Sequence, residues 1–249
     1  MCEGFTALGC IFVRSGKMAI EQRDETCSLR SPVRAVIFDC DGVLVESEVL
    51  GLRALQMALR DAGLELPMES LTRFSGRSHH ETLAELEQES GVSLLGSNLD
   101  ERLQLHYMGL VRSSGLRPCP GIPEFIAALK QKNIPFTLAS SGPRQKVLLS
   151  LRSVGLEPEF PDFISGDDVS RAKPAPDPFL AAAAILHINP SGCLAIEDSP
   201  NGIRSARAAG MQVVAVTNTY EREMLAEADL IVDDIQKLVV SKTGRIEVI

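Results

Sequence analysis

The sequence has no apolar run as long as the ~20 residues that a membrane-spanning helix requires, which predicts a soluble protein without a membrane partner. It also has no excess of basic residues, since 25 Lys and Arg stand against 33 Asp and Glu for a formal charge of −8. This argues against a nucleic-acid partner, because binding to a nucleic-acid backbone depends on clustered Lys and Arg. An anionic small molecule is compatible with the composition, provided that its site carries local positive charge.

Paired cysteines are missing as well. The six cysteines are scattered, without a CxxC pair or a metal-like spacing, at positions 2, 10, 27, 40, 119 and 193. This predicts free thiols in a reducing compartment, and therefore a cytoplasmic protein. Residues 1–31 lack a regular period and are interpreted as a disordered extension. An organellar transit peptide and a natural start at Met18 are left open, and so is the oligomeric state, although a monomer fits the sequence.

From Val33 onward, short apolar runs alternate with longer amphipathic ones. This rhythm predicts an α/β fold, a doubly wound parallel sheet with a Rossmann-like core. The expected strands are Ala35–Phe38, Phe136–Ala139, Leu194–Ile196, Val213–Val216 and Leu230–Val232, with a weaker one near Phe163–Ser165. Helices are expected at about Ile122–Lys132, Arg144–Val154, Pro178–Leu186 and Pro200–Ala209.

One interval breaks this alternation. The first two strands are about a hundred residues apart, whereas a crossover between parallel strands needs only about a dozen. Its helical patterns predict a cap domain at 48–116, inserted into a core domain formed by 32–47 and 117–249.

Two carboxylates follow the first predicted strand in "VIFDCDGVLVES". Asp39 and Asp41 are two residues apart, so in extended chain they point the same way, and Gly42 then permits a sharp turn. Ligands of doubly wound sheets bind at the carboxyl ends of the strands, where Asp39 lies. An aspartate-rich turn that caps the next helix explains "DCDG" alone equally well.

Other strand ends carry matching chemistry. Glu197 and Asp198 end another strand in "AIEDSPNG", where helix capping is again the simpler reading, but convergent carboxylates are also the ligands that Mg²⁺ prefers. Ser140 and Ser141 precede a helix in "TLASSGPR", a pattern typical of an anion site as well as of a cap. Lys173 in "RAKPAPDPF" would supply positive charge beside a phosphate.

In their types, their order and their positions at strand ends, these four motifs resemble those of the haloacid dehalogenase-like superfamily, in the branch of capped sugar-phosphate phosphatases and β-phosphoglucomutases. The resemblance spans about residues 33–238. It implies that Asp39 is a nucleophile that becomes an aspartyl phosphate and that Asp41 is the general acid and base. It implies one Mg²⁺ held by Asp39, Asp198, Glu197 and the main chain of Asp41, and a phosphate site formed by Ser140, Ser141 and Lys173.

The resemblance also identifies cap residues and two departures. Arg77 and His79 in "FSGRSHHETL" stand where a cap loop would reach the substrate, although the same stretch reads as a helix start. Glu46 replaces the usual aspartate before Ser47, and Gly51 stands where mutase members carry a histidine. We therefore expect a Mg²⁺-dependent phosphatase acting on a small phosphorylated metabolite such as a sugar phosphate. The alternatives are a phosphosugar mutase and a catalytically idle binding or regulatory protein on the same scaffold.

Overall fold

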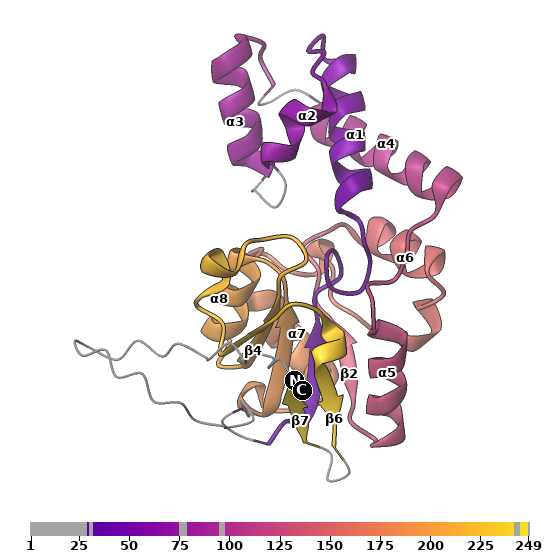
Figure 1. Cartoon of the computed structure of the whole chain (residues 1–249), viewed down its shortest axis with the longest axis vertical. Helices are drawn as coiled ribbons and strands as arrows, with labels where there is room; N and C mark the ends of the chain where they lie inside the picture. The colour runs from indigo at the N-terminus through magenta and orange to yellow at the C-terminus, as the bar shows by residue number, and fades with distance from the viewer. Residues whose placement is uncertain (1–28, 30–31, 75–78, 95–97, 242–244, 249) are drawn as a thin grey trace, which may run out of the picture.

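The computed structural model describes residues 29, 32–74, 79–94, 98–241 and 245–248, and shows a sheet core below a group of helices (Figure 1). The strands are β1 Ala35–Phe38, β2 Phe136–Leu138, β3 Cys193–Glu197, β4 Gln212–Val216, β5 Leu230–Val232, β6 Leu238–Val240 and β7 Ile246–Val248. The helices are α1 Glu48–Asp61, α2 Met68–Leu71, α3 His79–Ser90, α4 Leu99–Ser114, α5 Ile122–Gln131, α6 Arg144–Ser153, α7 Asp177–Ile185 and α8 Pro200–Ala208.

The core is a five-stranded sheet in the order β2-β1-β3-β4-β5, and every neighbouring pair is parallel. This confirms the predicted fold class and the five main strands. The strand order reverses between β1 and β3, since β2 lies on one side of β1 while β3, β4 and β5 continue on the other. In such sheets the crevice between the diverging connections is the usual ligand site, at the carboxyl ends of the two central strands.

Both faces of the sheet are covered, which is why its strands read as continuous apolar runs. Val36 and Phe38 of β1 belong to one hydrophobic core, together with side chains of α5 and α6. Ala35 and Ile37 point to the opposite face and pack with side chains of α7 and α8. Phe38 is the centre of the first core, where its ring meets three other phenylalanine rings edge-on at centroid distances of 6.1 to 6.2 Å.

Two parts of the core differ from the sequence-based expectation. The predicted strand near Phe163–Ser165 is wrong, because this segment forms only an isolated bridge between Ala139 and Ile164. The Ser165 main-chain N–H and hydroxyl both donate to the Asp168 carboxylate, which turns the chain into a short 3₁₀ helix instead of extending the pairing. The hairpin of β6 and β7 was not predicted, and it packs against the α5 side of the core through Leu238 and Ile246.

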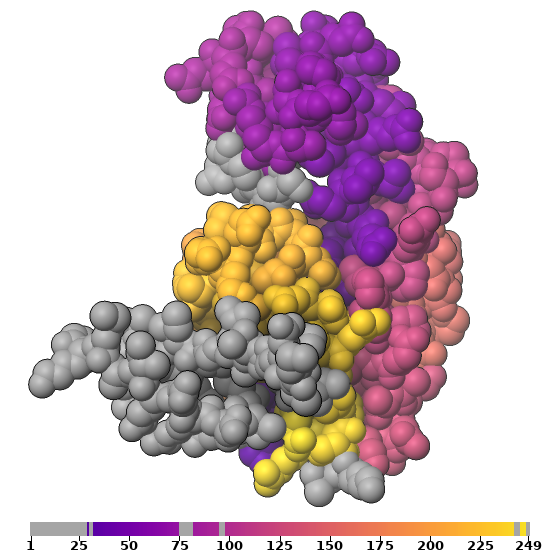
Figure 2. Space-filling model, in the orientation of Figure 1, coloured from indigo at the N-terminus to yellow at the C-terminus, as the bar shows by residue number. Residues whose placement is uncertain are grey.

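The segment 48–116, predicted as a cap, forms α1 to α4. Its helices share a separate hydrophobic cluster that includes Leu59, Leu71 and Leu86, so their apolar faces are buried against one another. Figure 2 shows these helices above the core. The helix α4 also reaches the core helix α6, where the Tyr107 hydroxyl lies 3.4 Å from Ser150 Oγ. No helix among the described residues has the length and apolarity to span a membrane.

Candidate active site

The predicted carboxylates meet at the reversal of strand order. Asp39 directly follows β1, and its N–H donates to the Ile196 carbonyl of β3 at 2.9 Å. Glu197 is the last residue of β3, and Asp198 follows it. All three acidic residues are buried, with exposures of 8% for Asp39, 0% for Glu197 and 5% for Asp198. Parallel pairing in register thus brings together residues that are more than 150 positions apart.

A tight turn after β1 closes this site. Gly42 has φ +74°, and a Cβ placed on it would lie 1.9 Å from Asp198 Oδ2. Glycine is therefore needed here both for its backbone conformation and for the close approach of Asp198. Asn218, in the loop after β4, donates from Nδ2 to the Gly42 carbonyl at 2.7 Å, and Thr219 donates to Asp198 Oδ2.

Lys173 is the positive charge at the centre of the carboxylates. Its Nζ hydrogen-bonds Asp39 Oδ1 and lies 2.7 Å from Glu197 Oε1, and only 5% of its side chain is exposed. The second oxygen of Glu197, Oε2, accepts from the N–H groups of Asp198 and Ser199 at 3.0 Å and from the Ser199 hydroxyl at 2.9 Å. Both oxygens of Glu197 are therefore engaged, and this residue holds Lys173 against the turn that begins α8.

The charges in this cluster do not balance. Burial raises the pKa of Asp39 to about 7, with the nearby Lys173 opposing the shift and the charge of Glu197 adding to it. Burial also raises the pKa of Asp198 well above its ordinary range, and the charges of Glu197 and Asp39 add to this effect. One buried lysine thus leaves the pKa values of Asp39 and Asp198 raised, and additional positive charge would favour the ionised forms of these two aspartates.

Asp41 has a different environment from its neighbours. Its Oδ2 accepts a hydrogen bond of 2.7 Å from Lys146 Nζ, while its Oδ1 is buried and has no hydrogen-bond partner among the described residues. Burial disfavours the ionised form of Asp41, but the charge and hydrogen bond of Lys146 outweigh it, with smaller contributions from the Ser47 side chain and the charge of Lys173, so the pKa of Asp41 is lowered. Lys146 was not predicted from the sequence. Its signal was a lysine in the first turn of the helix that follows "ASSG", at the same edge of the sheet.

Ser140 and Ser141 follow β2, which pairs with β1, so they lie at the edge of the sheet that carries Asp39. Ser140 is buried and its Oγ accepts from the Gly142 N–H at 3.1 Å, whereas Ser141 is exposed. Arg77 lies outside the described residues. His79 is the first residue of α3, but its side chain also lies outside the described part of the structure.

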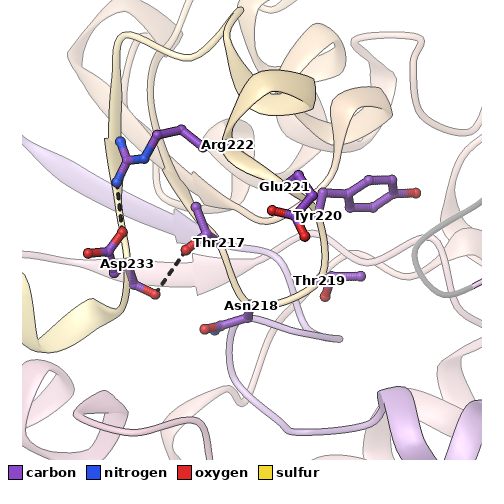
Figure 3. Close-up of a pocket in the computed structure, with 7 residues that line it drawn as sticks. All are labelled: Thr217, Asn218, Thr219, Tyr220, Glu221, Arg222 and Asp233. Carbon is purple, nitrogen blue, oxygen red and sulfur yellow. Dashed lines mark hydrogen bonds and ion pairs between the residues drawn. The ribbon is translucent and has the colours of Figure 1, made fainter. Parts of the chain in front are cut away.

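A polar cavity of about 350 Å³ lies at the loop that follows β4 (Figure 3). It is formed by the loop 217–222 and by Asp233. Arg222 forms an ion pair of 2.7 Å with Asp233 across it, so the charge of this arginine is already compensated. Asn218 and Thr219 of this loop hydrogen-bond Gly42 and Asp198, but none of the carboxylates of the site lines the cavity.

The donor chemistry of the site fits a divalent cation. Across the described ranges, no three Asp, Glu, His or Cys side chains are grouped as a ready-made cation site. Asp39 and Asp198 are nevertheless buried acidic groups near the main chain of the 40–42 turn, and a bound cation would offset the repulsion between them. Glu197 could contact a cation only by releasing one of its present hydrogen bonds.

Comparison with known proteins agrees with this architecture. A family model described as haloacid dehalogenase-like hydrolase matches residues 36–216, a range that runs from β1 to the end of β4. The chain belongs to this family. This membership in the haloacid dehalogenase-like hydrolases confirms the resemblance expected from the four motifs.

Individual members of the family show the same relationship. The hydrolase is 32% identical to the 6-phosphogluconate phosphatase of Escherichia coli, over 74% of this chain and 82% of that protein. It is 31% identical to the validoxylamine A 7'-phosphate phosphatase of Streptomyces hygroscopicus subsp. limoneus, over 82% of this chain and 95% of that protein. The crystal structure of a beta-phosphoglucomutase from Clostridium difficile matches with a TM-score of 0.67 and 26% identity, covering 81% of this chain and 91% of that one.

Proposed function

We propose that this haloacid dehalogenase-like hydrolase is a Mg²⁺-dependent phosphatase of small phosphate monoesters, with sugar phosphates as its substrate class. The observation that carries the proposal is the contact of Lys173 with the buried Asp39 at the carboxyl end of β1, with a second aspartate two residues later. The similar proteins named above include phosphatases of 6-phosphogluconate and of validoxylamine A 7'-phosphate, which supports the substrate class.

The chemistry follows from the different environments of the two aspartates. An Asp39 carboxylate oxygen attacks phosphorus, the bond from phosphorus to the ester oxygen breaks, and Asp41 donates a proton to the departing oxygen. Water then attacks phosphorus of the aspartyl phosphate, Asp41 accepts the water proton, and the Asp39 carboxylate is released with inorganic phosphate. Lys173 offsets negative charge between Asp39 and the phosphoryl group. Ser140 and Ser141, at the neighbouring strand end, are the proposed hydroxyl donors to phosphate.

Mg²⁺ would be held by the carboxylates of Asp39 and Asp198 and by the main-chain carbonyl of Asp41. Glu197 would join this set only by giving up its hydrogen bond with Lys173 or its hydrogen bond with Ser199. When bound, Mg²⁺ supplies the positive charge that lets an anionic nucleophile approach a phosphate dianion. The chain itself contributes the aligned carboxylates, the lysine and the buried surroundings.

A phosphosugar mutase is the second candidate, and the match to the beta-phosphoglucomutase of C. difficile favours it. Gly51 argues for hydrolysis instead. It stands where mutase members carry a histidine, and a Cβ added at this position would have no atom within 4 Å. An idle binding protein is least consistent with the site, because every carboxylate and the lysine needed for turnover are present.

The test is the release of inorganic phosphate from a panel of sugar phosphates and other small monoesters, in Mg²⁺ and in EDTA, with Asp39→Asn beside the wild type. The matched control is Glu227→Gln, since the Glu227 side chain is 55% exposed and pairs with Arg204 on the surface. Turnover that requires Mg²⁺, disappears in Asp39→Asn and persists in the control supports the proposal. Isomer interconversion without phosphate release would favour the mutase, and binding of an ester without either reaction would favour the idle protein.

A further inference from the structure

The two oxygens of the Asp41 carboxylate are unequal. Lys146 Nζ hydrogen-bonds Oδ2 at 2.7 Å, whereas Oδ1 is buried without a hydrogen-bond partner in the described part of the chain. A buried carboxylate oxygen without a partner is unfavourable, so its presence calls for a reason. Because one oxygen is tied to Lys146, rotation of the carboxylate is restricted and the direction of the other oxygen is set.

Lys146 is itself held from the other side. Its Nζ lies 4.8 Å from the centre of the Tyr107 ring, a cation–π contact, and Tyr107 is only 2% exposed. Tyr107 comes from α4, the last helix of the segment 48–116, whereas Lys146 comes from α6 of the core. The Tyr107 hydroxyl lies 3.4 Å from Ser150 Oγ, one turn after Lys146 on α6. A continuous set of contacts therefore runs from Asp41 through Lys146 to helix α4.

We infer that Lys146 and Tyr107 are positioning residues for Asp41. Lys146 holds Oδ2, so that Oδ1 is the oxygen that gives the proton to the leaving group and later takes the proton of water. Tyr107 keeps the ammonium of Lys146 in place and links the orientation of Asp41 to α4. This inference rests on the proposed phosphatase function and adds to it two residues that lie outside the four motifs.

A purely structural ion pair and a phosphate-binding lysine are the competing explanations, and the leaving group distinguishes them. An alkyl phosphate needs a proton on its departing oxygen, whereas 4-nitrophenyl phosphate releases a stable anion and needs little acid help. Loss of the orientation of Asp41 should therefore slow alkyl esters selectively. Loss of folding or of phosphate binding should slow both esters alike.

The experiment compares kcat/KM for the best alkyl sugar phosphate and for 4-nitrophenyl phosphate, because kcat/KM reports the steps up to the departure of the leaving group. For Lys146→Met we expect a loss of about a hundredfold with the alkyl ester and of less than about fivefold with the aryl ester. Lys146→Arg, which keeps a hydrogen-bond donor, should recover much of the kcat/KM that Lys146→Met loses with the alkyl ester. The matched control is Lys130→Met, because Lys130 is 55% exposed and pairs with Glu159 on the surface.

Tyr107 is tested by a graded pair of substitutions. Tyr107→Phe keeps the ring beside Lys146 and should leave the ratio of the two kcat/KM values close to that of the wild type. Tyr107→Leu removes the ring and should shift the ratio in the same direction as Lys146→Met, by about tenfold. An unchanged ratio in Tyr107→Leu would overturn the role of Tyr107 while leaving that of Lys146 standing.

Equal losses on both esters in Lys146→Met, or no loss, would overturn the inference. If Lys146→Met does not fold, the inference is still tested by the ratio of the two kcat/KM values in Lys146→Arg and in Tyr107→Leu. Failure of the proposed function looks different, because the wild type would then hydrolyse neither ester, or Asp39→Asn would retain the wild-type rate.

Discussion

Replacing Asp39 by asparagine is expected to make the metal-free protein more stable at alkaline pH while abolishing its activity. Asp39 is buried, with 12% of its side chain exposed, and its pKa is raised from 3.8 to about 7, mainly by burial. Asparagine is nearly the same size, carries no charge to bury and can still accept a hydrogen bond from Lys173 through its side-chain oxygen.

The sign follows from proton binding. Because the pKa of Asp39 is higher in the folded state, the folded protein binds more protons than the unfolded chain between pH 3.8 and about 7. The stabilisation is therefore complete below the unfolded-state pKa and is lost as pH rises through the folded-state pKa. A pKa shift of this size corresponds to about 4 kcal/mol in the free energy of unfolding, of which about 2 to 3 kcal/mol is lost between pH 5 and pH 8.

The assay is urea unfolding in EDTA at intervals from pH 5 to pH 8, with the free energy of unfolding of the wild type subtracted from that of Asp39→Asn. Titrations shared by both proteins cancel in this difference. We expect the difference to grow by about 2 to 3 kcal/mol in favour of the variant. Asp198 should add to it with the same sign, since the charge of Asp39 contributes to its raised pKa.

Parallel stability profiles for Asp39→Asn and the wild type would refute the reasoning, because they would mean that burial does not raise the pKa of Asp39. Magnesium provides an independent check. At pH 8, Mg²⁺ should raise the melting temperature of the wild type clearly more than that of Asp39→Asn, because the cation binds the ionised carboxylate. Equal shifts in the two proteins would argue that Asp39 is not a ligand.

Three further substitutions test the packing around the site. Gly42→Ala would place a Cβ 1.9 Å from Asp198 Oδ2 at a φ of +74°, so we expect at least about a hundredfold loss of phosphate release and about 1–2 kcal/mol lower stability. Gly51→Ala is the contrasting helix variant, with no atom within 4 Å of the new Cβ, and should keep full activity while gaining about 0.5–1 kcal/mol in urea unfolding. Phe38→Ala empties the centre of one core and should cost about 3–5 kcal/mol by the same method. A tolerated Gly42→Ala, a damaging Gly51→Ala or a neutral Phe38→Ala would each contradict the packing described.

Much of the core was predictable because its signals are local. The runs at Ala35–Phe38 and Leu230–Val232 form strands with the predicted bounds, since a parallel strand that packs into a core on each face of the sheet needs apolar residues on both faces. The predicted strand near Phe163–Ser165 failed for an equally local reason. Ser165, its last residue, donates two hydrogen bonds to Asp168. These local bonds compete with strand pairing, and a hydrophobic pattern does not show which of the two forms.

The site was predictable only in part. Asp39, Glu197 and Asp198 could be placed together because parallel strands bring their carboxyl ends to one edge. The partner of Asp41 could not be predicted, since Lys146 is 105 residues away and its role depends on where α6 begins relative to the turn after β1. The need for glycine at position 42 was visible as a turn, but the approach of Asp198 that makes it strict was not.

The sequence by itself determined which chemistry the chain carries and at which strand ends, because hydrophobic periodicity and residue type act over a few neighbouring positions. Only the tertiary structure decided how the charges are shared. It assigned Lys173 to Asp39 and Glu197, and Lys146 to Asp41, and it placed Tyr107 of α4 beside Lys146. These pairings join residues far apart in the chain, and their strength depends on burial and distance, which exist only once the elements have packed.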